Sequence, residues 1–266
     1  MTTDTDTPKI SSAGHILAMN NVALTRILQD KPSECLEIFR YALQQLQGSL
    51  QAMSSNQVYL AAAASHPPTC ATTATPQFQS VPLDTCKTNA AAQSNNGTFS
   101  FFHRMMTLSP ASLQQTTSTI STSDDNNNTV DTSLLQFQNS LLVTLFFNMA
   151  VCHHHLGLRQ GKSGELQTAL QLYELAFSMV EGSALALKDQ QMLLLCLYNN
   201  MGHVHSCFSN TAATQACVDW IQRIFLAFPH AQSQPEEEAN LAFDYEFFVQ
   251  YMPLRPCEQG NIAAAA

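Results

Sequence analysis

The sequence predicts an all-α protein made of antiparallel helical hairpins that stack as a short array, interrupted by a long disordered insert. Apolar residues recur at steps of three and four through most of the chain, which is the spacing of one buried helix face. No strand-like alternation of useful length is found. A five-residue pattern also occurs three times, which indicates repeated hairpins.

The first hairpin is expected at residues 14–53, and the preceding residues 1–13 are expected to be disordered. Pro32 disfavours helix at Lys31, and Ser33 is a suitable N-cap for the helix that follows. We therefore expect two helices joined by a tight turn at residues 30–33.

Residues 54–133 differ from the rest of the chain in composition. About half of them are Ser, Thr, Asn or Gln, so they offer too little apolar area to offset the entropy lost on ordering. We expect this low-complexity insert to be largely disordered. Residues 98–106 are an exception, because they include three phenylalanines and two methionines. They either dock on the helices or form an apolar patch without structure, and both readings stay open.

Residues 134–252 are expected to form two further hairpins and a C-terminal capping helix. Acidic side chains follow Pro235 and favour the start of that last helix, which either caps the open end of the array or docks a partner. Residues 253–266 are expected to be a loose tail. The helices are predicted at residues 134–158, 165–180, 190–208, 210–228 and 235–252.

The repeated pattern places a large apolar residue first, a small residue last and an asparagine two places before the small one. It reads Met-Asn-Asn-Val-Ala at residues 19–23, Phe-Phe-Asn-Met-Ala at 146–150 and Tyr-Asn-Asn-Met-Gly at 198–202. The second helix of each hairpin keeps a small-aromatic-small spacing, except in the third hairpin. These positions are Cys35, Phe39 and Ala42, then Ala169, Tyr173 and Ala176, then Thr214, Val218 and Ile221.

These patterns resemble the tetratricopeptide repeat family. The first unit fits that family's length without gaps, the second has an enlarged turn at residues 157–164, and the third has a degenerate second helix. The resemblance implies that the first helix of each hairpin lines a concave groove that binds a partner. The groove residues it implies are Asn20, Asn21, Asn148, Val151, His154, His155, Asn199, Asn200 and His203.

The shared asparagines, Asn21, Asn148 and Asn200, admit two roles. An amide side chain has both a donor and an acceptor, so it can pair with the backbone of an extended peptide. It can equally form hydrogen bonds between helices and keep the hairpins in register. The lysines with which some family members clamp a carboxylate-ended peptide are missing here, so that ligand is not expected.

Two motifs suggest a site for a metal ion or a phosphate group, and we interpret both as structural. Histidines 153–155, with His203 and His205, suggest a metal cluster, but consecutive helical residues point about 100° apart and no acidic ligand is near. The loop from Gly157 to Ser163 is one residue short of a phosphate-binding loop and lies between helices rather than after a strand. We expect no metal and no cofactor.

The predicted function is that of a scaffold or adaptor that binds another protein, not an enzyme. The alternative is a self-assembling structural protein, a homo-oligomer without a peptide ligand. A net charge of −9 without a basic cluster disfavours nucleic acid. Polar residues interrupt the most apolar run, residues 134–151, so a membrane span is not expected. Without a signal-like N-terminus, the protein is expected in the cytosol or nucleus, with its eight cysteines as thiols.

Overall fold

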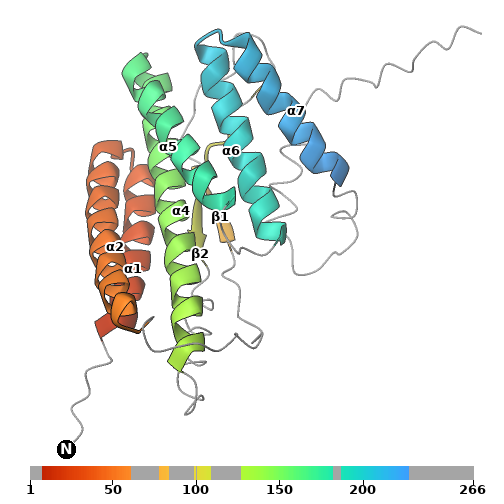
Figure 1. Ribbon diagram of the computed structural model, residues 1–266. Coiled ribbons are helices and arrows are strands. Elements are labelled where there is room, and N and C mark those ends of the chain that lie inside the picture. The colour runs from red at the N-terminus through yellow and green to blue at the C-terminus, as the bar shows by residue number, and fades with distance from the viewer. Residues whose placement is uncertain are drawn as a thin grey trace, which may run out of the picture.

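The structure is a computed structural model, drawn as a ribbon in Figure 1. It describes residues 8–60, 78–83, 99, 101–108, 127–181 and 187–227. Most of these residues are helical, as the sequence predicts. The helices are α1 (Pro8–Leu28), α2 (Pro32–Leu60), α4 (Asn127–Gln160), α5 (Ser163–Glu181), α6 (Leu187–Cys207) and α7 (Thr211–Ala227), and the strands are β1 (Phe78–Pro82) and β2 (Arg104–Leu108).

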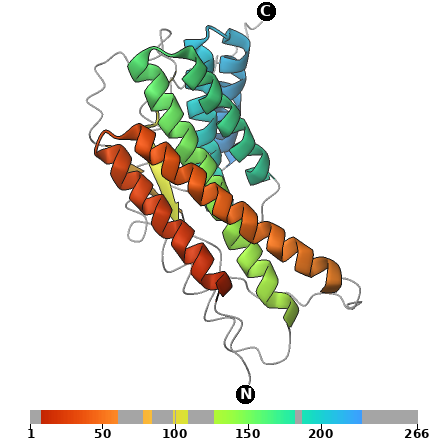
Figure 2. The same ribbon diagram turned by 90° about the vertical axis from the view of Figure 1, so that its left-hand side faces the viewer.

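The helices pack as three pairs that are adjacent in the sequence. α1 contacts α2, α4 contacts α5 and α6 contacts α7, and each pair runs up and down side by side (Figures 1 and 2). Contacts between pairs run from α2 to α4 and from α5 to α6. The first helices of the pairs are therefore α1, α4 and α6.

The three turns that close the pairs share one geometry. In each, one residue has a positive φ, and the N–H of the next residue donates to the carbonyl five positions earlier, which is the Schellman arrangement. The positive-φ residues are Asp30 (59°), Gly161 (64°) and Ser209 (56°). The closing bonds run from Lys31 to Arg26 (3.0 Å), Lys162 to Gly157 (3.1 Å) and Asn210 to His205 (2.9 Å).

The second turn is not enlarged, so that prediction is wrong. α4 continues to Gln160, and only residues 161–162 separate it from α5. Gly157 was expected to break the helix, but it lies within α4 where α5 crosses closely. A Cβ at this position would lie 2.7 Å from Cδ2 of Leu166, so glycine allows the two helices to approach.

The second helices bury the residues of the small-aromatic-small spacing. All nine positions are buried, including those of the third hairpin, where the spacing departs from the pattern. Between α2 and α4, the buried Sγ atoms of Cys35 and Cys152 lie 3.3 Å apart. Burial raises the pKa of the Cys152 thiol well above its usual range. All cysteines among the described residues are free thiols.

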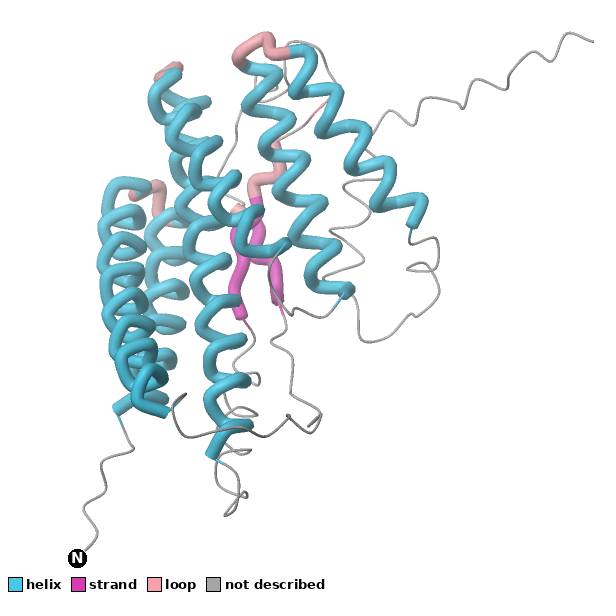
Figure 3. The backbone as a smooth tube through the Cα atoms, in the orientation of Figure 1, coloured by secondary structure: helices cyan, strands magenta, loops and turns pink. Residues whose placement is uncertain are grey.

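A two-stranded antiparallel sheet lies beside the first helices (Figure 3). β1 pairs with β2 in a register that places Phe78 opposite Leu108 and Pro82 opposite Arg104. β2 contacts α4 and α1. Phe78 and the first three residues of β2 are buried, as are Leu83, Phe99, Phe101 and Phe102 around the sheet.

This sheet corrects the expectation for residues 54–133. α2 extends to Leu60 and α4 begins at Asn127, so both helices reach into the range assigned to the insert, and residues 78–82 and 104–108 are strands. α1 likewise begins at Pro8, within the range expected to be disordered, and α2 begins at Pro32 rather than after an N-cap at Ser33. The rest of the insert, residues 1–7, the predicted helix at 235–252 and the tail at 253–266 lie outside the described residues.

One helix in the described part of the chain is long and apolar enough to cross a membrane. It covers residues 135–160 of α4, with a mean hydropathy of 1.4 in its most apolar window, and 83% of that window is buried against the rest of the protein. The burial explains the apolar character of this helix, because α4 is the central helix that contacts α2, α5, α1 and β2.

Candidate functional site

The residues that the sequence analysis placed in a groove meet a segment of the same chain. Asn20 lies on α1, Asn148 on α4 and Asn200 on α6, and all three side chains are fully buried. The backbone next to them belongs to residues 99–108, which comprise β2 and the residues leading into it; we call these residues the inner segment. We call the surface formed by Asn20, Asn148, Asn200, His154 and His203 the asparagine groove.

Asn148 pairs with both main-chain polar groups of Met106. The N–H of Met106 donates to Oδ1 of Asn148 at 2.7 Å, and Nδ2 of Asn148 donates to the Met106 carbonyl at 2.7 Å. The side-chain amide thus replaces the peptide group of a neighbouring strand. Such short bonds between buried groups satisfy a donor and an acceptor that water cannot reach.

Asn200 repeats this arrangement four residues earlier in the inner segment. The N–H of Phe102 donates to Oδ1 of Asn200 at 3.0 Å, and Nδ2 of Asn200 donates to the Phe102 carbonyl at 3.2 Å. Four residues of extended chain cover about 13 Å. Two neighbouring helical pairs therefore bind the inner segment at two points of its backbone, one in β2 and one just before it.

The two bound positions lie on the same edge of the inner segment. In an extended strand, the backbone groups of successive residues point to opposite edges, so Phe102 and Met106, which are four residues apart, present theirs to the same edge. Residues on the other edge pair with the preceding strand, as the N–H of Leu83 does with the carbonyl of His103 at 3.1 Å. One edge of the strand is thus completed by β1 and the other by asparagine side chains.

In the first hairpin, the buried contact comes from Asn20 and not from the shared Asn21. Nδ2 of Asn20 donates to the Met106 carbonyl at 3.4 Å, and its Oδ1 accepts from Nδ2 of Asn148 at 2.9 Å. Asn21 is exposed and accepts a hydrogen bond from the hydroxyl of Thr107 at 2.9 Å. The two adjacent asparagines therefore contact consecutive residues of the inner segment, one through its backbone and one through its side chain.

Two histidines form a buried platform under the ring of Phe101. The ring centroids of Phe101 and His154 are 4.1 Å apart, and those of Phe101 and His203 are 6.1 Å apart. Nε2 of His154 lies 2.9 Å from Nδ1 of His203, and its Nδ1 lies 3.3 Å from the hydroxyl of Tyr173. Burial, and then the proximity of His203, lower the pKa of His154 well below its usual value. His154 is therefore uncharged at physiological pH.

Gly202, the small residue of the third pattern, contacts the inner segment rather than another helix. A Cβ at this position would lie 2.4 Å from the Cζ of Phe99, which no real side chain tolerates. The absence of a side chain at Gly202 provides the space for the Phe99 ring, which is buried. This role differs from the close packing of helices that the sequence analysis assigned to the small residues.

Three further residues predicted for the groove are also buried. Nδ2 of Asn199 donates to Oδ1 of Asn200 at 3.2 Å, so it orients the amide that binds Phe102. Val151 is fully buried within α4. His155 is buried too, and its pKa is lowered first by burial and then by Arg159.

The asparagines also connect helices, which is the second of the two roles left open by the sequence, while the extended backbone that they bind belongs to this chain and not to a partner. Asn148 links α4 to α1 through Asn20, and Nδ2 of Asn200 donates to the Tyr173 hydroxyl of α5 at 3.1 Å. Each amide therefore joins two helices and one strand. The sequence analysis did not identify the residues that fill the groove, although the cluster of aromatic and methionine residues at 98–106 marked their place.

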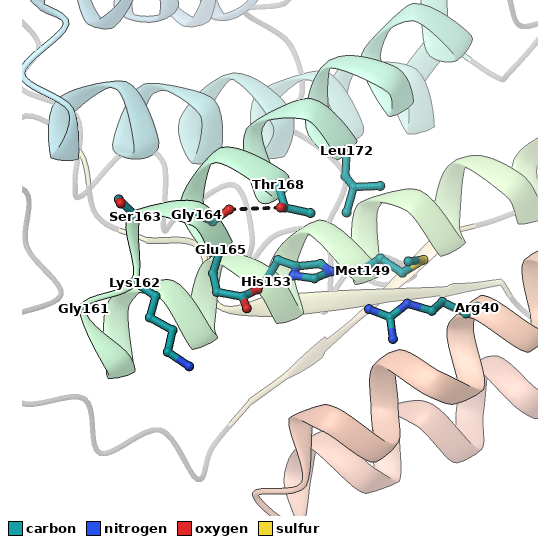
Figure 4. A pocket seen from close by; sticks show the side chains of 10 residues that line it. All are labelled: Arg40, Met149, His153, Gly161, Lys162, Ser163, Gly164, Glu165, Thr168 and Leu172. Atoms are coloured by element: carbon teal, nitrogen blue, oxygen red, sulfur yellow. Dashed lines mark hydrogen bonds and ion pairs between the residues drawn. The ribbon is translucent and has the colours of Figure 1, made fainter.

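Within the described ranges, no group of three or more His, Cys, Asp or Glu side chains has a geometry suited to a metal ion. His153 does not join the platform; its Nδ1 lies within hydrogen-bonding distance, 2.6 Å, of Oε2 of Glu165. Both residues line a separate open depression of about 690 Å³ between α2, α4 and α5 (Figure 4). The loop that resembles a phosphate-binding motif contributes Lys162 to the same depression, and Arg40 lies on its other wall.

Comparisons with known proteins give no relative: no protein-family model, no curated protein and no solved structure matches the chain.

Proposed function

We propose that this protein is a scaffold or adaptor, without catalytic activity, whose asparagine groove binds an extended segment of another protein. The resemblance of its repeated pattern to tetratricopeptide repeats supports this function, as does the position of the groove on α1, α4 and α6. The proposal also includes a location in the cytosol or nucleus, no requirement for a cofactor, and no binding to nucleic acid or to a membrane.

The observation that carries the proposal is the paired hydrogen bonding of Asn148 and Asn200. Each amide bonds to the N–H and the C=O of one residue, and the two residues lie four positions apart on one edge of a strand. This is the chemistry of strand addition, in which the main chain supplies affinity and side chains supply specificity. Two amides at this spacing can bind any extended backbone whose side chains fit the walls.

The walls of the groove favour a neutral, aromatic segment. Phe101 packs on the uncharged His154, and Phe99 fills the space above Gly202. The groove has no lysine or arginine among its defining residues, so a carboxylate-ended or phosphorylated peptide would lose its hydration without gaining a charge partner.

A peptide-binding measurement tests this function. The probe is a fluorescein-labelled peptide with the sequence of residues 98–109, which we call the segment peptide. We expect saturable binding to the full-length protein, measured by fluorescence anisotropy. Replacing both Asn148 and Asn200 by alanine should weaken binding tenfold or more, since each lost hydrogen bond costs about 0.5–1.5 kcal/mol.

Two controls define the result. A segment peptide that carries an N-methyl group at the position of Met106 cannot donate to Asn148 and should bind at least tenfold more weakly. Circular dichroism must show that the double variant keeps its helical content. Equal binding of the two peptides, or of the two proteins, would exclude the asparagine groove as the binding surface.

One observation favours self-assembly as a second candidate function. α7 exposes large apolar side chains, with Trp220 at 46% and Leu226 at 80% exposure. Exposed apolar patches commonly mark protein interfaces. Native mass spectrometry at micromolar concentration distinguishes the two functions, because a stable dimer that dissociates in a Trp220→Ser/Leu226→Ser variant supports the homo-oligomer.

A further inference from the structure

The inner segment has the contacts of a ligand. Its backbone is bound by side-chain amides of α4 and α6, and β2 pairs along its other edge with β1, which also lies outside the helical pairs. Its largest side chains enter spaces that the helices provide, Phe99 above Gly202 and Phe101 on the histidine platform.

The chain that links the inner segment to the helices is long enough for the segment to leave. Residues 109–126 connect Leu108 to the start of α4, and residues 61–77 connect α2 to β1. Eighteen residues can reach about 60 Å when extended.

We propose that the inner segment is a built-in competitor, which occupies the asparagine groove until an extended aromatic segment of another protein displaces it. This inference rests on the proposed function and adds the partner's chemistry. The positions of Phe99, Phe101, Phe102 and Met106 give the sequence pattern expected of the partner. It has an aromatic residue, any residue, a second aromatic residue and then a residue bound by Asn200, with a second bound residue four positions later.

This pattern follows from the contacts of each position, some of which involve the side chain and some the backbone. Phe99 and Phe101 lie in shaped, buried spaces, so these positions require large flat side chains. Phe102 and Met106 are bound through their N–H and C=O groups, so those two positions require a free amide N–H, which excludes proline, and their buried side chains require an apolar residue. The partner is therefore a neutral strand without proline at the two bound positions, with two aromatic residues separated by one residue.

A pair of variants of the full-length protein tests the competition. In the open variant, Phe99→Ala/Phe101→Ala removes both rings from the competitor and leaves the groove intact. Tyr41→Ala, which removes an exposed ring on α2, is the matched control. We expect the open variant to bind the segment peptide at least tenfold more tightly than the parent, and the control to bind like the parent.

The locked variant keeps the test decisive if the open variant does not fold. Asn21→Cys/Thr107→Cys replaces a partly exposed pair that is joined by a 2.9 Å hydrogen bond, so oxidised glutathione can link α1 to the inner segment. The oxidised form should bind the segment peptide at least tenfold more weakly than the same protein after reduction. The two single-cysteine variants, treated in the same way, show whether native cysteines interfere.

The outcomes separate this inference from the proposed function. If the parent, open and locked proteins all bind the segment peptide equally, and binding still depends on Asn148 and Asn200, the groove binds peptides but the inner segment does not compete. If no form binds while the disulfide forms readily, the inner segment is a permanent part of the core and both proposals fail. An open variant that dimerises instead of binding peptide would assign the groove to a second copy of the chain and overturn the foreign partner.

Discussion

Asn148 and Met106 are joined by two hydrogen bonds of 2.7 Å, one in each direction between a side-chain amide and a backbone peptide group. The residues are 42 positions apart, and one belongs to the central helix while the other belongs to a short strand in a polar stretch. This pair, repeated by Asn200 and Phe102, connects the helical pairs to the inner segment and defines the site.

Replacing Asn148 and Asn200 by alanine should release the inner segment from the helices. Each substitution removes the side-chain amide that binds a buried N–H and C=O of the inner segment, and a buried polar group that loses its hydrogen bond costs about 1–3 kcal/mol. We expect the amides of residues 99–108 to exchange with solvent at least tenfold faster, measured by hydrogen exchange and mass spectrometry. Gln45→Ala, at an exposed position of α2, is the control and should leave the exchange unchanged. Unchanged exchange in the double variant would mean that the apolar contacts alone bind the segment.

Two glycine-to-alanine substitutions should change stability in opposite directions. At Gly202 the new methyl group would lie 2.4 Å from the ring of Phe99, and overpacking of this kind costs about 1–3 kcal/mol. At Gly48, in the exposed interior of α2, no atom lies within 4 Å of the new Cβ, so the better helix propensity of alanine should stabilise by about 0.5–1 kcal/mol. Urea denaturation of both variants measures the difference. Equal stability changes would show that Phe99 is not packed on Gly202.

Enlarging the small residues between helices should destabilise the fold. Ala150 on α4 and Ala169 on α5 are both fully buried, so leucine at either position should cost about 1–3 kcal/mol by overpacking. Ala216→Leu, at an exposed position of α7, is the matched control and should have little effect. Thermal melting followed by circular dichroism provides the comparison, and parent-like melting of both core variants would place these residues away from the helix contacts.

Acidification should weaken the protein through the histidine platform. The pKa of His154 is lowered from its ordinary 6.5, so below that pH the unfolded chain binds a proton that the folded chain does not. The stabilising effect of the neutral imidazole is complete above 6.5 and decreases as the pH falls towards the folded-state pKa. Urea denaturation at pH 7.5 and 5.5 should show a smaller loss for His154→Gln than for the parent. Some loss remains in this variant, since the pKa values of His155 and His205 are also lowered. An identical loss in both proteins would exclude His154 as the responsible group.

The sequence predicts the helices well because their apolar spacing is regular. The chemistry of the amide predicts that the asparagines pair with an extended backbone, but the sequence analysis assigned that backbone to a partner, whereas the backbone found next to them belongs to this chain. It does not distinguish Asn20 from Asn21, since adjacent asparagines fit the repeated pattern equally. It also misreads Gly157, because a glycine inside a helix at a close crossing looks the same in sequence as one that ends a helix.

The strands could not be predicted from alternation. In β2, four of five residues are buried. Helices and neighbouring strand residues cover both faces of the strand, so apolar and polar residues do not alternate along it. The surrounding residues are polar and repetitive, and the contacts that order β2 come from α1 and α4, which lie far away in the sequence. Only the aromatic and methionine content of residues 98–106 indicated that this stretch is unlike its surroundings.

Binding through the main chain also makes the two sides of the interface unequal in their tolerance of substitution. At Met106 most side chains would leave both hydrogen bonds intact, since these bonds use only the peptide group. At Asn148 no other residue supplies an amide at the same reach, because aspartate lacks the donor and glutamine is one methylene longer. Because the Met106 side chain is buried, a saturation library scored for folding should accept apolar residues of several shapes at position 106 and almost no substitution at position 148. Sequence changes would therefore accumulate in the strand while the helices keep their asparagines.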